Sequence, residues 1–322
     1  MKTYLLVLII LCALSYLYLR LAVKYKIIDK PNKRSSHKKI TVRGGGILFP
    51  IAIILFFLFN NFQYPYFFTG VIAISIISFL DDIYTLSSKI RFPFQMIAIF
   101  LILYQVGVPF EPFYVFVFYL IFGVGIVNMF NFMDGINGIT GLYSISVLLG
   151  FYLINCNEGL INSNLIIYSL IALLIFGFYN FRKKALFFAG DIGSIAIGML
   201  IFFLGMYFTF YLSSPLILLL VIVYGADSGN TLIYRKFFTK ESVLEPHRHH
   251  IYQKLVDNKC MSHLQVSAVY AMIQIVINVL IFKTYRLELQ TQFIIFISLI
   301  LAFILLYIYL FIKLKRKKIS NG

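Results

Sequence analysis

Aspartates stand at the ends of apolar stretches at four places in this chain. Asp81-Asp82 end one such stretch, Asp134 and Asp227 end two others, and Asp191 begins a fourth. A carboxylate within a bilayer span costs about 3 kcal/mol even on the lenient insertion scale. The chain has only 12 acidic residues, so four such places suggest one site for metal or phosphate chemistry, provided that they face the same side of a membrane.

The run around Asp134 is dense in polar residues. Asn128 and Asn131 are three residues apart and share one helical face, and Asp134 follows by the same step. Gly135 and Gly138 allow a sharp turn or the close approach of a ligand. A plain helix end needs only one polar residue and one glycine, so this run favours a site.

Asp191 lies in Phe188-Ala189-Gly190-Asp191-Ile192-Gly193-Ser194, at the start of an apolar stretch. One interpretation is a simple N-cap, since Asp is common there. The other is a metal–phosphate site, because a helix N-terminus attracts phosphate and a carboxylate binds Mg²⁺. The adjacent pair Asp81-Asp82 is similarly open to two interpretations, a solvated loop start or a site shared with a cation.

Three of the five histidines fall in the run His247-Arg248-His249-His250. A bare histidine cluster suggests zinc, but an arginine within it argues against a cation site. Arginine offers a bidentate fork to phosphate, so the run favours anion binding over a solvated basic loop.

The elements that must position these residues are transmembrane helices. The chain is 61% hydrophobic and 12% charged, whereas a soluble domain has roughly 25% charged residues. Since a span needs about 20 mostly apolar residues, the sequence predicts an all-α polytopic membrane protein with about eleven spans: 3–23, 45–60, 66–81, 92–108, 113–131, 138–155, 164–181, 192–212, 215–233, 263–282 and 292–312.

The distribution of basic residues predicts the orientation of these spans. The net charge of +16 could suggest nucleic acid, but 24 of the 28 Lys and Arg residues lie in alternate loops and the C-terminal tail. The positive-inside rule places those loops in the cytoplasm, with the N-terminus outside and the C-terminus inside. We therefore expect one transmembrane catalytic domain over 1–322, a bilayer rather than nucleic acid as partner, and an active-site face formed by the cytoplasmic loops 24–44, 82–91, 132–137, 182–191 and 234–262.

On this map the aspartates at span ends all share the cytoplasmic face. An ion-coupled transporter, the alternative from another functional class, more often holds such groups near the bilayer midplane. A row of carboxylates at the interface instead suits chemistry between a water-soluble substrate and a lipid headgroup.

Five stretches, in order from Asp29 to Gln253, resemble the motifs of one family. They read D-x-P-N-x-R-S-x-H…T-x-R-G-G-G, D-D-x-x-x-L, N-x-x-N-F-M-D-G-x-x-G, F-x-G-D-x-G-S and H-R-x-H-x-Y-Q. Together they look like the polyprenyl-phosphate N-acetylhexosamine-1-phosphate transferases, a membrane type of glycosyltransferase family 4. The branch resembled is that of WecA and WbpL, which begins O-antigen and similar glycans. The related peptidoglycan branch, the phospho-MurNAc-pentapeptide transferases, usually has three consecutive histidines where this chain has His247-Arg248-His249-His250.

The resemblance implies transfer of a sugar-1-phosphate from a UDP-N-acetyl amino sugar, such as UDP-GlcNAc, to undecaprenyl or another polyprenyl phosphate, with Mg²⁺ or Mn²⁺ and release of UMP. It implies a multi-pass protein of the inner (cell) membrane, a homodimer as a candidate assembly, and an active site on the cytoplasmic face. It also suggests roles: Asp81, Asp82 and Asp134 in catalysis, Asp191 and Asp134 on the metal, and substrate contacts from Asn128, Asn131, Asn137, Phe188, His247, Arg248, His249, His250 and Arg43.

Two positions depart from the family pattern. Thr85 replaces the third acid of the DDxxD form found in some relatives, and Asn137 stands where many relatives have a second Asp. That Asp is linked to nucleotide contact, and Asn can still donate and accept hydrogen bonds to a base.

Two other enzyme classes fit poorly, since a UbiA-type prenyltransferase needs two Asp-rich boxes and a CDP-alcohol phosphotransferase needs Ala-Arg soon after Asp-Gly.

Overall fold

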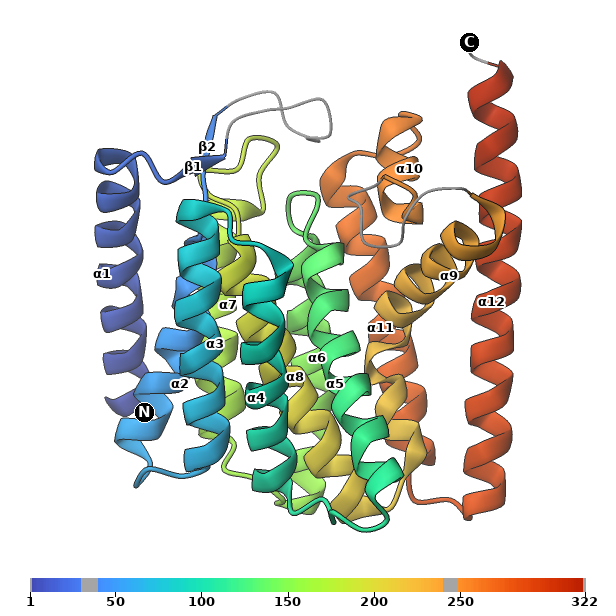
Figure 1. Ribbon diagram of the computed structural model, residues 1–322, viewed down its shortest axis with the longest axis horizontal. Helices are drawn as coiled ribbons and strands as arrows, with labels where there is room; N and C mark the ends of the chain where they lie inside the picture. The colour runs from blue at the N-terminus through green and yellow to red at the C-terminus, as the bar shows by residue number, and fades with distance from the viewer. Residues whose placement is uncertain (1, 30–39, 240–247, 321–322) are drawn as a thin grey trace.

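The computed structural model describes residues 2–29, 40–239 and 248–320 and shows an almost wholly helical protein (Figure 1). Two short 3₁₀ helices, η1 (Gly45–Ile47) and η2 (Pro215–Val221), and one pair of antiparallel two-residue strands, β1 (Ile28–Asp29) and β2 (Thr41–Val42), complete the described elements. The predicted all-α class is confirmed. The α-helices are α1 (Lys2–Lys24), α2 (Leu48–Phe59), α3 (Pro65–Tyr84), α4 (Ser88–Val106), α5 (Phe113–Met133), α6 (Ile139–Glu158), α7 (Asn164–Asn180), α8 (Gly190–Leu212), α9 (Ile222–Phe238), α10 (Ile251–Asp257), α11 (His263–Thr284) and α12 (Leu289–Ser320).

Each of the eleven predicted spans coincides with a helix or a pair of consecutive helices. Within the described residues, nine helical stretches are long and apolar enough to cross a membrane, with Pro215–Phe238 taken as one. The other two predicted spans correspond to shorter apolar helices, Gly45–Phe59 and Asn164–Asn180. The chain is therefore a multi-pass membrane protein. In Figure 1, α1 starts in the lower half of the bundle and α12 ends above its top.

Helix α8 forms the centre of the bundle. It contacts α2, α3, α4, α5 and α6. Of the residues in its most apolar stretch, 67% are buried inside the protein, against 22% for α1 and 11% for α12. Helices that are apolar all round belong in a core or in lipid. The two poorly buried helices lie at opposite edges in Figure 1, where their apolar surfaces suit contact with lipid.

Segment η1 packs directly on the start of α8 through glycine. A Cβ added to Gly46 would lie 2.3 Å from the Cα atom of Gly193, so only glycine permits this approach of the two backbones. The amide of Gly46 also donates to the carbonyl oxygen of Ala189, at 3.0 Å, and that of Gly45 donates to the carbonyl oxygen of Phe188, at 2.8 Å. This contact joins the segment that follows β2 to the beginning of α8.

The ninth predicted span, 215–233, is not one continuous helix. It starts as the 3₁₀ helix η2, and the backbone changes course at Val221 (φ −126°, ψ 18°) before α9 begins. In hydrocarbon every backbone polar group must find a partner within the protein. Gln274 of α11 supplies two, since its Oε1 accepts from the Val223 amide at 3.3 Å and its Nε2 donates to the Leu219 carbonyl at 3.2 Å. Beyond this break α9 runs obliquely toward α12 in Figure 1.

Two expected loop boundaries differ from those of the structure, because α3 continues to Tyr84 and α8 begins at Gly190. Asp81 and Asp82 do not open a loop but lie in the last turn of α3, which Thr85 ends with a left-handed conformation (φ +54°). Asp191 does not precede its helix but lies in the first turn of α8. Both shifts bring the carboxylates into ordered helix ends, where their directions are set by the helix.

Candidate active site

Asp82 joins the end of α3 to the start of α8. Its Oδ1 accepts the backbone N–H of Asp191 at 2.9 Å, and its Oδ2 accepts that of Ile192 at 3.1 Å. The first N–H groups of a helix have no partner within it, so Asp82 acts as the cap of α8 from another helix. A Cβ on Gly190, whose φ is +72°, would lie 2.4 Å from Asp82 Oδ2, so glycine is required there. Asp191 is thus not the N-cap of its own helix, and two of the N–H groups at the helix N-terminus that was expected to attract phosphate are already occupied.

Two arginines hold the three carboxylates together. Arg91 Nη1 lies 2.6 Å from Asp81 Oδ2 and 2.9 Å from Asp191 Oδ2. Arg43 lies with Nε 2.7 Å from Asp82 Oδ1 and with Nη2 3.3 Å from Asp191 Oδ1. Burial alone would lower the pKa of Arg43, but the carboxylates of Asp82 and Asp191 raise it above its usual value. Asp191 therefore sits between two guanidinium groups, each shared with a carboxylate of α3.

The polar run at the end of α5 reaches the same place. Asn131 Nδ2 donates to Asp191 Oδ1 at 2.9 Å and to Ser194 Oγ at 3.1 Å. Asp134, just beyond α5, accepts the hydroxyl of Thr140 on Oδ1 at 2.6 Å. Burial raises the pKa of Asp134 to about 6, while the Thr140 hydrogen bond acts in the opposite direction.

Four of these side chains, those of Arg43, Asn131, Asp134 and Asp191, border a polar cavity of about 270 Å³. Seven of the predicted site residues line it: Arg43, Asn131, Asp134, Asn137, Phe188, Asp191 and Arg248. The lining also includes Asp29, Gly135, Ile136, Asn180, Gly190 and Gln253. The cavity thus combines carboxylates and guanidinium groups with amides and one aromatic ring, which suits a charged ligand that also carries a planar base.

Several predicted site residues lie outside this lining. Asn128 pairs with Gln95 of α4 through both amide groups, at 3.2 and 3.4 Å, so its side chain ties α4 to α5. The ring of His249 packs edge-on against the ring of Tyr234, with 5.8 Å between the ring centroids. His250 is 3% exposed, with Nδ1 3.2 Å from Asp227 Oδ1, so its position differs from that expected of a direct phosphate ligand. His247 lies outside the described residues.

Comparison with known proteins connects this cavity to a family. The sequence model of glycosyl transferase family 4 matches residues 64–209, which contain Asp81, Asp134 and Asp191. A protein of Bacillus subtilis (strain 168), named probable undecaprenyl-phosphate N-acetylglucosaminyl 1-phosphate transferase, is 26% identical over 311 aligned residues, covering 87% of this chain and 84% of that protein. The matched part of the chain is similar to glycosyl transferase family 4. The protein is a phosphosugar transferase.

The donor chemistry of this transferase fits Mg²⁺. Asp134 and Asp191 offer carboxylate oxygens to the cavity and Asn131 adds an amide, and Mg²⁺ binds oxygen ligands. In residues 2–29, 40–239 and 248–320, no group of three or more His, Cys, Asp or Glu side chains is arranged to hold a metal. Magnesium in phosphate enzymes commonly takes one or two carboxylates and completes its coordination with substrate phosphate and water, so a pair of aspartates suffices.

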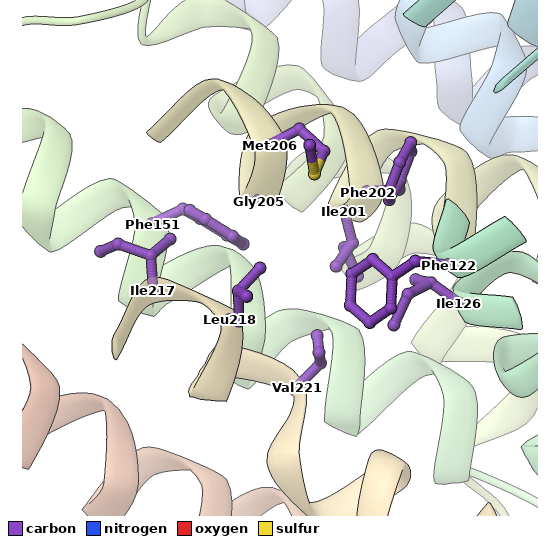
Figure 2. Close-up of a pocket in the computed structure, with 10 residues that line it drawn as sticks. All are labelled: Phe122, Ile126, Phe151, Ile201, Phe202, Gly205, Met206, Ile217, Leu218 and Val221. Atoms are coloured by element: carbon purple, nitrogen blue, oxygen red, sulfur yellow. The ribbon is translucent and has the colours of Figure 1, made fainter. Parts of the chain in front are cut away.

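The transferase has a second, very different pocket among its apolar helices (Figure 2). It holds about 20 Å³ and is lined only by apolar residues of α5, α6, α8 and η2, among them Phe122, Phe151 and Met206. None of these side chains can donate or accept a strong hydrogen bond or carry charge. Phosphate chemistry therefore belongs to the polar cavity.

Sequence reasoning missed several residues of the site. Arg91 counted only as a topological charge, although its spacing ten residues after Asp81 on the same side of the membrane was a usable signal. Gln253 was noticed within its motif but given no role, and it lines the cavity. Thr140 and Asn180 carried no signal, because both lie outside the motifs that pointed to the site.

Proposed function

We propose that this transferase moves an N-acetylhexosamine-1-phosphate group from a UDP-sugar to a polyprenyl phosphate such as undecaprenyl phosphate. The observation that carries the proposal is the polar cavity at the helix ends of a membrane bundle, which is lined by Asp134, Asp191, Arg43 and Arg248 together. Such a place lets a soluble nucleotide sugar meet a lipid headgroup. The named function of the Bacillus subtilis relative supports the same reaction.

The proposed chemistry is a displacement at phosphorus. An oxygen of the lipid phosphate forms a bond to the phosphorus that carries the sugar, and the bond from that phosphorus to the UMP oxygen breaks. The products are polyprenyl-diphosphate-sugar and UMP. The nucleophile is already an anion, so no strong base is needed and the main barrier is the approach of two anions.

The side chains that line the cavity are suited to lower that barrier. Arg43 and Arg248 bring guanidinium groups to it, which in this structure pair with Asp82 and Asp191 and with Asp257 respectively. Guanidinium groups match the geometry of phosphate oxygens. Asp134 and Asp191 would hold Mg²⁺, which when bound supplies charge stabilisation for the leaving phosphate. Phe188 offers a ring on which uracil can stack.

We propose that Asp81 and Asp82 position other side chains of the site and do not themselves contact the substrate or the metal. Neither lines the cavity, whereas Asp191, whose oxygens also accept from protein donors, does. Asp81 accepts from the Leu86 amide and from Arg91, and Asp82 caps α8 and pairs with Arg43. Their contribution is to hold Asp191 and its two arginines in place for the ligand.

The test is UMP release by purified protein in lipid, across a panel of UDP-sugars, with and without Mg²⁺ and polyprenyl phosphate. We expect release that requires all three components, that stops on chelation by EDTA and that returns with added Mg²⁺. The variant Glu288→Gln, which removes an acid outside the site, should keep full activity. UMP release without polyprenyl phosphate, or none with any UDP-sugar, would refute the proposal.

The same panel separates the alternatives. Use of UDP-MurNAc-pentapeptide alone would indicate the peptidoglycan branch, while an N-acetylhexosamine donor supports initiation of O-antigen or another surface polysaccharide.

We further propose that the protein lies in the cell membrane with the cavity toward the cytoplasm, because the basic loops gather at that face. Labelling of a cysteine introduced at exposed Tyr84 from one side of sealed vesicles tests that orientation.

A further inference from the structure

Asp227 is a buried carboxylate outside the cavity, and the proposed reaction gives it no role. It lies on α9 and is 0% exposed. Its Oδ2 accepts the hydroxyl of Tyr270 at 2.6 Å, and its Oδ1 accepts that of Thr231 at 3.3 Å. A buried carboxylate is costly unless hydrogen bonds replace its hydration. The hydroxyl groups of Tyr270 and Thr231 provide part of that replacement.

The remaining bonds of Asp227 go to the start of α10. Oδ1 accepts the backbone N–H of Ile251 at 3.0 Å, Oδ2 accepts that of Tyr252 at 3.2 Å, and the ring of His250 stands 3.2 Å from Oδ1. The first N–H groups of a helix need an outside partner, and negative charge is favoured there. The cap of α10 is thus provided by a different helix, which fastens α10 to α9 independently of the intervening chain.

Helix α10 in turn forms part of the cavity wall. Gln253 belongs to α10, Arg248 precedes it by three residues, and both line the cavity. The hydroxyl of Tyr252 donates to the carbonyl oxygen of Phe132 at 3.0 Å, two residues before Asp134. A displacement of α10 would therefore move a cationic side chain, an amide and the support of the Asp134 turn together.

We propose that Asp227 is a positioning residue for the nucleotide-sugar side of the cavity, acting through the cap of α10. This inference rests on the proposed function for the identity of the ligand. It gives Asp227 and His250 a joint role that differs from phosphate binding: they place Arg248 and Gln253 without touching the substrate.

The experiment compares Asp227→Asn with the wild type in lipid by two readouts. The first is amide hydrogen exchange of the segment 250–257, which needs no substrate. Asparagine keeps the volume, but its amide nitrogen cannot accept an N–H, so we expect exchange there to rise by about ten-fold or more for the loss of one hydrogen bond to a charged group. Exchange in α3, which does not line the cavity, should not change.

The second readout is steady-state kinetics. We expect the KM for the UDP-sugar to rise by about ten-fold, again the equivalent of one such bond, while the KM for polyprenyl phosphate stays the same. Unchanged exchange over 250–257 would overturn the capping role, and raised exchange with both KM values unchanged would overturn its link to the cavity. An equal rise of both KM values would indicate general loosening and would also contradict the proposal.

A milder variant keeps the test decisive if Asp227→Asn does not fold. Tyr270→Phe removes one donor to the same carboxylate and leaves the α10 backbone bonds in place, so we expect a smaller change of the same kind in both readouts. If wild-type protein releases no UMP from any UDP-sugar, the proposed function fails. The exchange measurement then still decides whether Asp227 holds α10.

Discussion

Replacing Asn137 by aspartate would restore the residue that many relatives carry, yet we expect it to harm this protein. The Asn137 side chain belongs to a residue that is 5% exposed, and its Nδ2 donates to the carbonyl oxygens of Arg182, at 2.9 Å, and Lys183, at 3.4 Å. An aspartate would place a negative oxygen against the same two carbonyls. The asparagine is therefore matched to the loop that follows α7.

The magnitude follows from the lost bonds. The shorter hydrogen bond is worth about 1 kcal/mol, and leaving a buried polar group unpaired costs about 1–3 kcal/mol more. We expect Asn137→Asp to lose about 2–4 kcal/mol of stability, seen as a lower midpoint of thermal unfolding in detergent by several degrees. Because Asn137 also lines the cavity, the KM for the UDP-sugar should rise in the same variant.

The control is Asn61→Asp, which adds the same charge at an exposed asparagine for which the structure shows no side-chain hydrogen bond. It should unfold at the wild-type temperature. If Asn137→Asp were as stable as the wild type, or bound the UDP-sugar more tightly, the interpretation of Asn137 as a donor to the 182–183 carbonyls would be refuted.

Three further predictions concern the carboxylates and their partners. Asp191→Asn should reduce UMP release by about a hundred-fold or more, since it removes the charge that would hold Mg²⁺, and full activity would exclude Asp191 as a ligand. Arg91→Gln should lower both activity and the midpoint of thermal unfolding, because it removes the charge between Asp81 and Asp191, whereas Arg91→Lys should retain more of each. Equal losses of activity and stability in Arg91→Gln and Arg91→Lys would contradict the interpretation that the charge of Arg91 joins Asp81 to Asp191. Thr140→Val removes the hydrogen bond that lowers the pKa of Asp134, so in metal-free protein that pKa should move above about 6 in a ¹³C NMR titration, and a fall would contradict the assignment.

The gathering of the aspartates at one end of the bundle could be predicted from the sequence. Asp81, Asp134 and Asp191 each stand at the end of an apolar stretch, and the alternation of basic loops places those ends on one side. What the sequence does not contain is the direction of each side chain. Asn128 and Asn131 are three residues apart on one helical face, yet Asn131 contacts Asp191 and Asn128 pairs with Gln95.

The caps from other helices and the break before α9 could not be predicted either. Asp82 caps α8, and Asp227 caps α10, across long stretches of chain, whereas sequence rules for caps consider only the neighbouring residues. The segment 215–233 has no Pro or Gly at the break. The partners that make the break tolerable come from elsewhere: Gln274 of α11 and also Tyr143 of α6, whose hydroxyl accepts the Tyr224 amide at 3.3 Å.

The glycine contact between η1 and α8 has a consequence for the order in which this protein assembles. Six helices separate Gly46 from Gly193 along the chain, and contacts between such distant segments form only after the intervening chain has been made and closed into a loop. Until α8 enters the membrane, Asp82 has neither the amides of Asp191 and Ile192 nor the full set of charges around it. During synthesis the two aspartates at the end of α3 therefore lack these partners at first. The site forms only after α8 has been inserted.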